Sequence, residues 1–144
     1  MQVTPKAYKI WMVLFDCPNK WTNVSDIAYK VDMSNRQVLS VLQTMHSPYI
    51  EKEVLGDYMG TTVRLAITDE ELRKLRKDVL MAYHDLNEEV FENIRSTLSP
   101  IGWTSAQDIA NITGYRGSRV YIAMSLMDDV ISKDTGSNKL YMLC

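Results

Sequence analysis

The chain has 144 residues, of which 46% are hydrophobic and 24% are charged, a balance that excludes a disordered chain. Its net charge of -2 weakens the case for nucleic-acid binding without removing it, because the field that matters for binding is local. No apolar run approaches the roughly 18 residues of a membrane span and the amino end lacks the apolar block of a signal peptide, so we expect a cytoplasmic protein with no membrane partner. Two cysteines without CxxC spacing predict free thiols.

The first predicted helix begins at Pro5. Thr4 supplies a hydroxyl at the N-cap, and proline is common at the first helical position. Apolar side chains then recur at steps of three and four residues up to Phe15, so one face of this helix is expected to lie on a core. Residues 16–20, with the sequence DCPNK, break the helix. Trp21 follows, and we expect it to anchor the core.

Two further helices follow, with a tight turn between them. Thr22 or Asn23 is expected to cap a short helix that ends near Lys30, and Ser34 is expected to cap a longer helix over residues 35–46. A short helix, a tight turn and a longer helix form a helix-turn-helix motif.

A β-hairpin and another helix are predicted next. Residues 49–54 and 62–67 alternate between apolar and polar side chains on either side of a glycine-containing turn, which is typical of a hairpin. Thr68 and Glu71 have the spacing of a capping box, so a helix begins there.

The helix that begins after Thr68 has apolar residues at steps of three and four, including Leu75 and Val79. It either packs across both halves of the chain or pairs with a second copy over residues 69–98 as a short coiled coil, which makes a homodimer possible. Near residue 85 the helix either continues or restarts, because Asp85 and Glu88 have the spacing of another capping box.

The second half of the chain repeats the first. A shift of 82 residues places Trp21–Met45 on Trp103–Met127 without a gap, and seven of the 25 positions are identical. Thr104 and Gln107 again have capping-box spacing, and residues 130–143 predict a second hairpin. The chain is therefore expected to be a tandem repeat with a first module at 1–68, a connecting helix at 69–89 and a second module at 90–144.

Three helices followed by a hairpin resemble the winged helix-turn-helix superfamily, here in a tandem arrangement. The phrase Thr-x-x-x-Asp-Ile-Ala, at residues 22–28 and 104–110, looks like the second helix of many small regulators. The resemblance implies a mainly α fold with small β-hairpin wings, an α+β architecture of two modules joined by a long helix. It also implies binding of double-stranded DNA, by a transcriptional regulator or by a replication or partition factor.

The candidate DNA contacts lie on the third helix and the wing of each module, because the second helix of a helix-turn-helix reads bases with its amino end. Arginine pairs well with guanine, and asparagine or glutamine pairs well with adenine. Wing cations are candidates for phosphate contacts. The predicted contacts are Ser34, Asn35, Arg36, Gln37, Ser40 and Arg64 in the first module, and Arg116, Ser118, Arg119, Lys133 and Lys139 in the second.

A different interpretation is that the chain is an adaptor between proteins. The tip of the first wing contains Tyr58 and Met59 but no lysine or arginine, which suits contact with a protein partner. Leu75 and Val79 are further candidates for protein contacts. Polar residues at the start of the third helices are also explained as helix caps and solvated surface.

No enzyme motif occurs in the sequence. It contains no phosphate-binding glycine loop, nucleophile elbow or HExxH motif. His46 and His84 are the only histidines, and neither has cysteine or carboxylate neighbours at the spacing of metal ligands. We therefore expect a protein with no catalytic site, no metal and no cofactor.

Overall fold

The computed structural model describes residues 1–55 and 60–144, and the described residues divide into two compact units at 1–79 and 80–144. The first unit contains α1 (Pro5–Asp16), β1 (Thr22–Asn23), α2 (Val24–Val31), α3 (Asn35–Thr44), β2 (Ile50–Val54), β3 (Thr61–Leu65) and most of α4 (Asp69–Tyr83). The second contains α5 (Glu88–Arg95), β4 (Thr104–Ser105), α6 (Ala106–Thr113), α7 (Gly117–Ser125), β5 (Val130–Asp134) and β6 (Lys139–Leu143).

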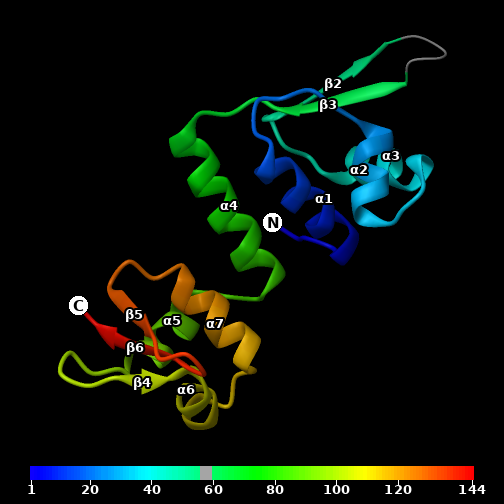
Figure 1. The fold of residues 1–144 in the computed structure, drawn as a ribbon. Helices are drawn as coiled ribbons and strands as arrows, with labels where there is room; N and C mark the ends of the chain where they lie inside the picture. The colour runs from blue at the N-terminus through cyan, green and yellow to red at the C-terminus, as the bar shows by residue number, and fades with distance from the viewer. Residues whose placement is uncertain (56–59) are drawn as a thin grey trace. The chain divides into compact units, whose positions relative to one another are not determined.

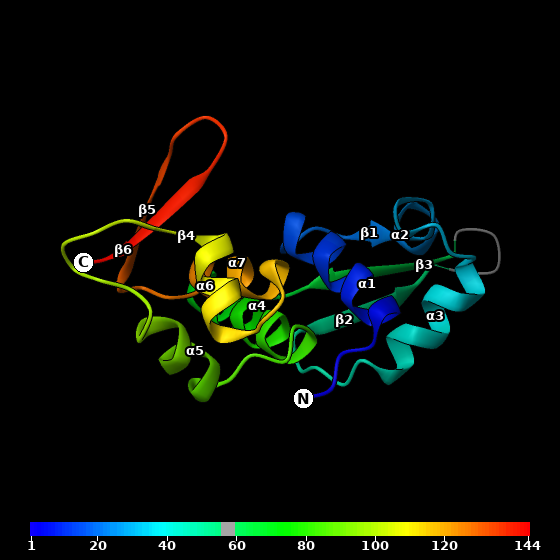
Figure 2. The same cartoon turned by 90° about the horizontal axis from the view of Figure 1, so that it is seen from below.

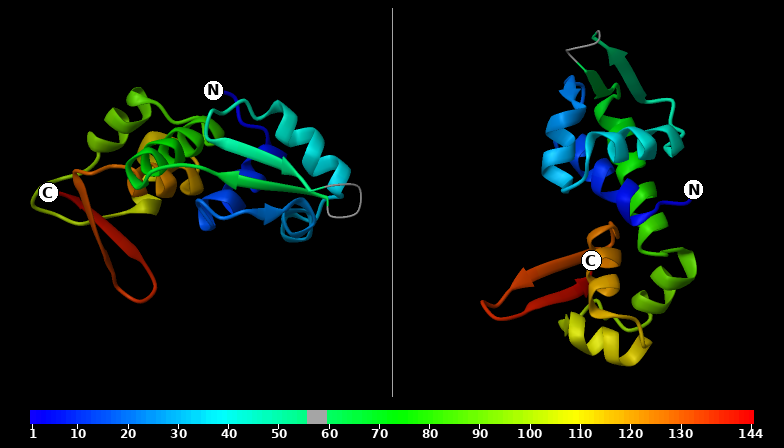
Figure 3. Two further views of the ribbon diagram at one scale, coloured as in Figure 1. Left: turned by 90° about the horizontal axis from the view of Figure 1, so that it is seen from above. Right: turned by 90° about the vertical axis from the view of Figure 1, so that its right-hand side faces the viewer.

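Both units have the same order of elements: a helix, a short strand, two helices and a hairpin (Figure 1). In each, the short strand pairs with the last strand of the hairpin, which gives three-stranded antiparallel sheets of order β1-β3-β2 and β4-β6-β5. The views in Figures 2 and 3 show the β5–β6 hairpin projecting away from α6 and α7. The fold is therefore a tandem of two winged-helix-like modules, mainly helical with two small sheets.

The short strands β1 and β4, which complete the two sheets, were not predicted. Thr22 pairs with Val63, and Thr104 pairs with Tyr141. Because Thr104 belongs to a strand, the predicted capping box at Thr104 and Gln107 is wrong. Ser105 is the N-cap of α6 instead, and its hydroxyl accepts a hydrogen bond from the backbone N–H of Asp108 at 3.1 Å.

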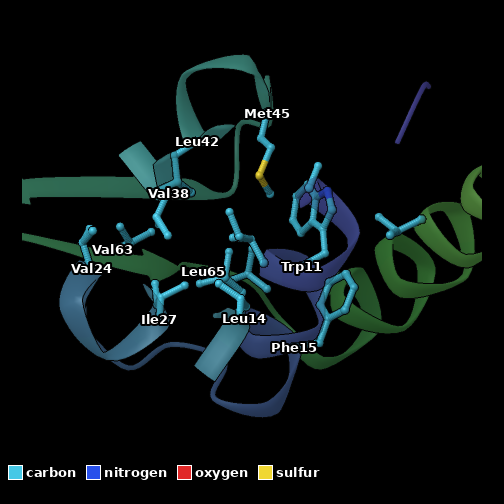
Figure 4. Close-up of a cluster of buried hydrophobic side chains, with 14 of the residues drawn as sticks. Trp11, Leu14, Phe15, Val24, Ile27, Val38, Leu42, Met45, Val63 and Leu65 are labelled. Carbon is cyan, nitrogen blue, oxygen red and sulfur yellow. The ribbon is translucent and has the colours of Figure 1, made fainter. Parts of the chain in front are cut away.

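Each module has its own hydrophobic core. Figure 4 shows the first, where side chains from α1, α2, α3 and β3 converge. The repeated positions Ile27 and Ile109 are fully buried in their respective cores, as are Val38 and Val120. The identities between the two halves thus include core residues at equivalent places in the helix-turn-helix.

Trp21 is not the core anchor that the sequence predicted. Its side chain is 43% exposed, and that of the equivalent Trp103 is 39% exposed. Each tryptophan directly precedes a short strand, so its side chain lies at the end of the sheet instead of among the helices. The indole that is buried in the first core is Trp11 on α1.

The connecting helix is shorter than predicted. It begins as expected, with the Thr68 hydroxyl accepting from the Glu71 N–H at 3.2 Å and Glu71 Oε1 accepting from the Thr68 N–H at 3.1 Å. It ends at Tyr83 instead of residue 89, because Asp85 takes a left-handed backbone conformation (φ 54°). The next helix is capped by Asn87 and not by Asp85. No helix in the described ranges is long and apolar enough to cross a membrane.

Candidate nucleic-acid interface

The amino end of α3 is organised by a capping box. The Ser34 hydroxyl accepts a hydrogen bond from the Gln37 backbone N–H at 3.1 Å, and Gln37 Oε1 accepts from the Ser34 N–H at 3.0 Å. Both residues were predicted to contact DNA. Their side-chain oxygens are engaged in capping the helix. These two residues therefore fix the position of the helix start and are less available for contact with DNA.

The other three candidates on this helix are exposed and free. The side chains of Asn35, Arg36 and Ser40 have no hydrogen bond or ion pair with another residue in the described part of the chain. The helix itself, NRQVLSVLQT, contains no carboxylate. Arg36 therefore presents an unneutralised guanidinium at the positive end of the helix dipole, where an anion is favoured.

Arg64 on β3 is held within the sheet. Its Nη2 lies 2.6 Å from Glu51 Oε2 on β2, and the two residues are directly opposite each other in the hairpin. Its guanidinium carbon lies 4.7 Å from the centre of the Trp21 ring, a cation–π distance. Because Glu51 neutralises its charge, Arg64 is a weaker candidate for a phosphate contact than the sequence suggested.

The amino end of α7 in the second module carries Arg116, which has no ion pair with a described residue, and Arg119, which is held in place. Arg116 is the N-cap residue, and both it and Ser118 are exposed. Arg119 donates a hydrogen bond from Nη2 to the backbone carbonyl of Asp85, and the same nitrogen lies 3.6 Å from Asp85 Oδ2. The Arg119 guanidinium also lies 4.8 Å from the centre of the Tyr115 ring. Arg119 is thus tied to its own module.

The two lysines of the second wing lie over aromatic rings. Lys133 Nζ is 4.5 Å from the centre of the Trp103 ring, and Lys139 Nζ is 5.4 Å from that of Tyr121 on α7. An aromatic face attracts a cation but does not cancel its charge. These contacts orient both ammonium groups while leaving them positive.

The residues proposed for protein contacts have mixed positions. Leu75 and Val79 are 7% and 0% exposed and belong to the first core, so they are not free for a second copy as predicted. They are buried because the face of α4 that carries them covers that core. The homodimer through residues 69–98 stays a prediction, but Leu75 and Val79 cannot form its interface. Tyr58 and Met59 lie outside the described residues.

A cluster of ion pairs around Arg95 lies in the second module, away from the amino end of α7. Arg95 on α5 donates from Nε to Asp129 Oδ2 at 2.8 Å and from Nη1 to Glu92 Oε1 at 2.5 Å. The bond from Arg95 lowers the pKa of Asp129 below its usual value, and the same bond raises the pKa of Arg95. The cluster joins α5 to the turn before β5 and has a structural role.

Within the described part of the chain, no group of three or more histidine, cysteine or acidic residues is placed to hold a metal ion. No protein-family model matches the chain, and no curated protein matches it. Among solved structures, it is similar to the crystal structure of the DIP2311 protein from Corynebacterium diphtheriae, with 14% identity and a TM-score of 0.35. That similarity covers 96% of this chain and 26% of the DIP2311 chain, so this chain spans about a quarter of the length of the DIP2311 chain.

Proposed function

We propose that this chain binds double-stranded DNA in a sequence-specific way, with α3 of the first module as the main reading element. The observation that carries the proposal is the free, exposed pair Asn35 and Arg36 at the amino end of a helix without carboxylates. In a helix-turn-helix, this end of the second helix faces base edges in the major groove. Arginine recognises guanine there, and asparagine recognises adenine.

The second module contributes mainly phosphate contacts. Arg116, Lys133 and Lys139 keep their positive charges, whereas Arg119 is engaged by Asp85. Contacts to phosphate position a protein on the duplex but carry no sequence information directly. A protein with one reading helix and one positioning module suits transcriptional regulation or replication and partition, and it requires no catalytic site.

The test is selection from a pool of randomised duplexes at low salt. The unmodified chain is expected to retain and enrich a subset of sequences. Arg36→Ala should weaken retention and relax the preference at one position, whereas Arg76→Ala, which removes an equal charge from the exposed face of α4, should change retention little. Failure to retain any duplex, or equal losses in both variants, contradicts the proposal.

A protein adaptor is the second candidate, supported by exposed apolar side chains beside the first wing tip. Val54 is 74% exposed and Leu55 is 38% exposed. Exposed apolar side chains at a tip suit a protein contact better than a phosphate backbone. This function is favoured if no duplex is retained and if Val54→Ser with Leu55→Ser abolishes capture of a partner that the unmodified chain binds.

A further inference from the structure

The first module contains a cavity that DNA binding does not use. It has a volume of about 690 Å³ and is lined by α1, by the segment that follows α3 and by one side of α4. This volume lies within the range of about 300 to 1,000 Å³ that is common for small-molecule sites. Its apolar lining includes Ala7, Met45 and Leu75.

The cavity is also lined by Trp11, whose indole N–H has no hydrogen-bond partner among the described residues. Trp11 is only 4% exposed, and its ring stacks on Phe15 with the ring centres 5.4 Å apart. Figure 4 shows Trp11 and Met45 side by side at one end of the core cluster. The indole N–H forms no hydrogen bond with any residue in the described ranges, and it is not one of the buried polar atoms that lack a partner, so solvent reaches it. The cavity therefore offers a donor without an acceptor.

The charged lining residues differ in how far they are already engaged. Glu71 accepts hydrogen bonds from the N–H and the hydroxyl of Thr68 at 3.1 and 2.8 Å, and these bonds lower its pKa. Its interaction with Tyr49 raises the pKa of that phenol. Lys74 and Asp78, one helical turn apart on α4, have no ion pair with a described residue. The carboxylate of Glu71 is thus occupied, while the ammonium of Lys74 is free.

We propose that this cavity binds a small organic carboxylate with an apolar body. The indole N–H of Trp11 and the ammonium of Lys74 hold the carboxylate, and the apolar lining covers the body of the ligand. Asp78 provides a place for an ammonium group if the ligand is an amino acid. The site is independent of the DNA-binding proposal, because none of these groups belongs to the amino end of α3.

Trp11 itself provides the assay. The chain has three tryptophans, so Trp21→Phe with Trp103→Phe leaves Trp11 as the sole indole. Addition of 3-phenylpropionate is expected to change Trp11 fluorescence in a saturable way. L-Phenylalanine, which adds an ammonium group for Asp78, should also bind in a saturable way. Phenethylamine, which lacks the carboxylate, should not bind.

A matched pair of lysine variants tests the charge. Lys74→Gln should weaken 3-phenylpropionate binding by about tenfold, the loss of one charge-assisted contact. Lys77→Gln, on an exposed part of the same helix outside the lining, should leave it unchanged. Calorimetric titration of the unmodified chain provides the same answer if the tryptophan variants do not fold. Absence of saturable binding, preference for phenethylamine or equal losses in both lysine variants overturns the proposal.

Discussion

The capping box of α3 gives a quantitative prediction about the stability of the first module. Ser34→Ala removes the hydroxyl that accepts from the Gln37 N–H at 3.1 Å and leaves that donor to water. Loss of a serine N-cap costs about 1 kcal/mol, within a range of about 0.5 to 2 kcal/mol. Since single domains are stable by only about 5 to 15 kcal/mol, this loss is measurable.

Urea unfolding followed by circular dichroism measures the effect. With a slope of about 1 to 3 kcal/mol per M, a loss of about 1 kcal/mol lowers the unfolding midpoint by about 0.3 to 1 M. Ser40→Ala is the matched control, because Ser40 lies in the middle of the same helix and is exposed. Alanine is the better helix former there, so Ser40→Ala should be neutral or slightly stabilising.

Gln37→Glu gives an independent check on the same capping box. Glutamate keeps the acceptor for the Ser34 N–H and places a negative charge in the first turn, so it should preserve or raise stability. The reasoning is refuted if Ser34→Ala and Ser40→Ala have equal effects, or if Gln37→Glu destabilises the module.

Three further predictions concern the core, the helix ends and pH. Ile109→Ala should lower the free energy of unfolding by about 2 to 5 kcal/mol in urea titrations, because the side chain is fully buried; a smaller loss means that the core collapses around it. Asp32 and Gly114 end α2 and α6 in the left-handed conformation, with φ of 55° and 79°. Asp32→Gly should therefore stabilise, and Gly114→Ala should destabilise by about 1 kcal/mol, in thermal melts; the opposite signs contradict this account. Asp129→Asn should destabilise the chain at neutral pH, because Arg95 lowers the folded pKa of Asp129; the difference from the unmodified chain should shrink as pH falls from the unfolded value of about 3.9 through the lowered folded pKa.

The tandem arrangement was predictable because the helix-turn-helix is a local structure. Caps and apolar spacing define its helices, and a repeated core leaves repeated residues such as Ile27 and Ile109. The short strands were not predictable in this way. A two-residue strand has no periodicity of its own, and β1 becomes a strand only because Thr22 pairs with Val63 about 40 residues further along the chain.

The residue types of the candidate site were predictable. Which of these side chains are already paired within the protein was not. The sequence shows arginines at the amino ends of α3 and α7. It cannot show that Asp85 holds Arg119 while Arg36 has no partner among the described residues. The pair Arg64 and Glu51 could have been anticipated from hairpin register once the turn length was known. Trp21 was misjudged because a large aromatic residue fits a core and the end of a sheet equally well.

The most direct test of DNA binding through α3 is the affinity of the chain for its selected duplex, compared with single-base variants of that duplex. For the unmodified chain, one base-pair change should weaken binding by about 1 to 3 kcal/mol, and Arg36→Ala should abolish that discrimination. Affinity should also fall steeply with salt. Binding that is the same for all duplexes, or discrimination that survives Arg36→Ala at every position, contradicts a reading role for Arg36.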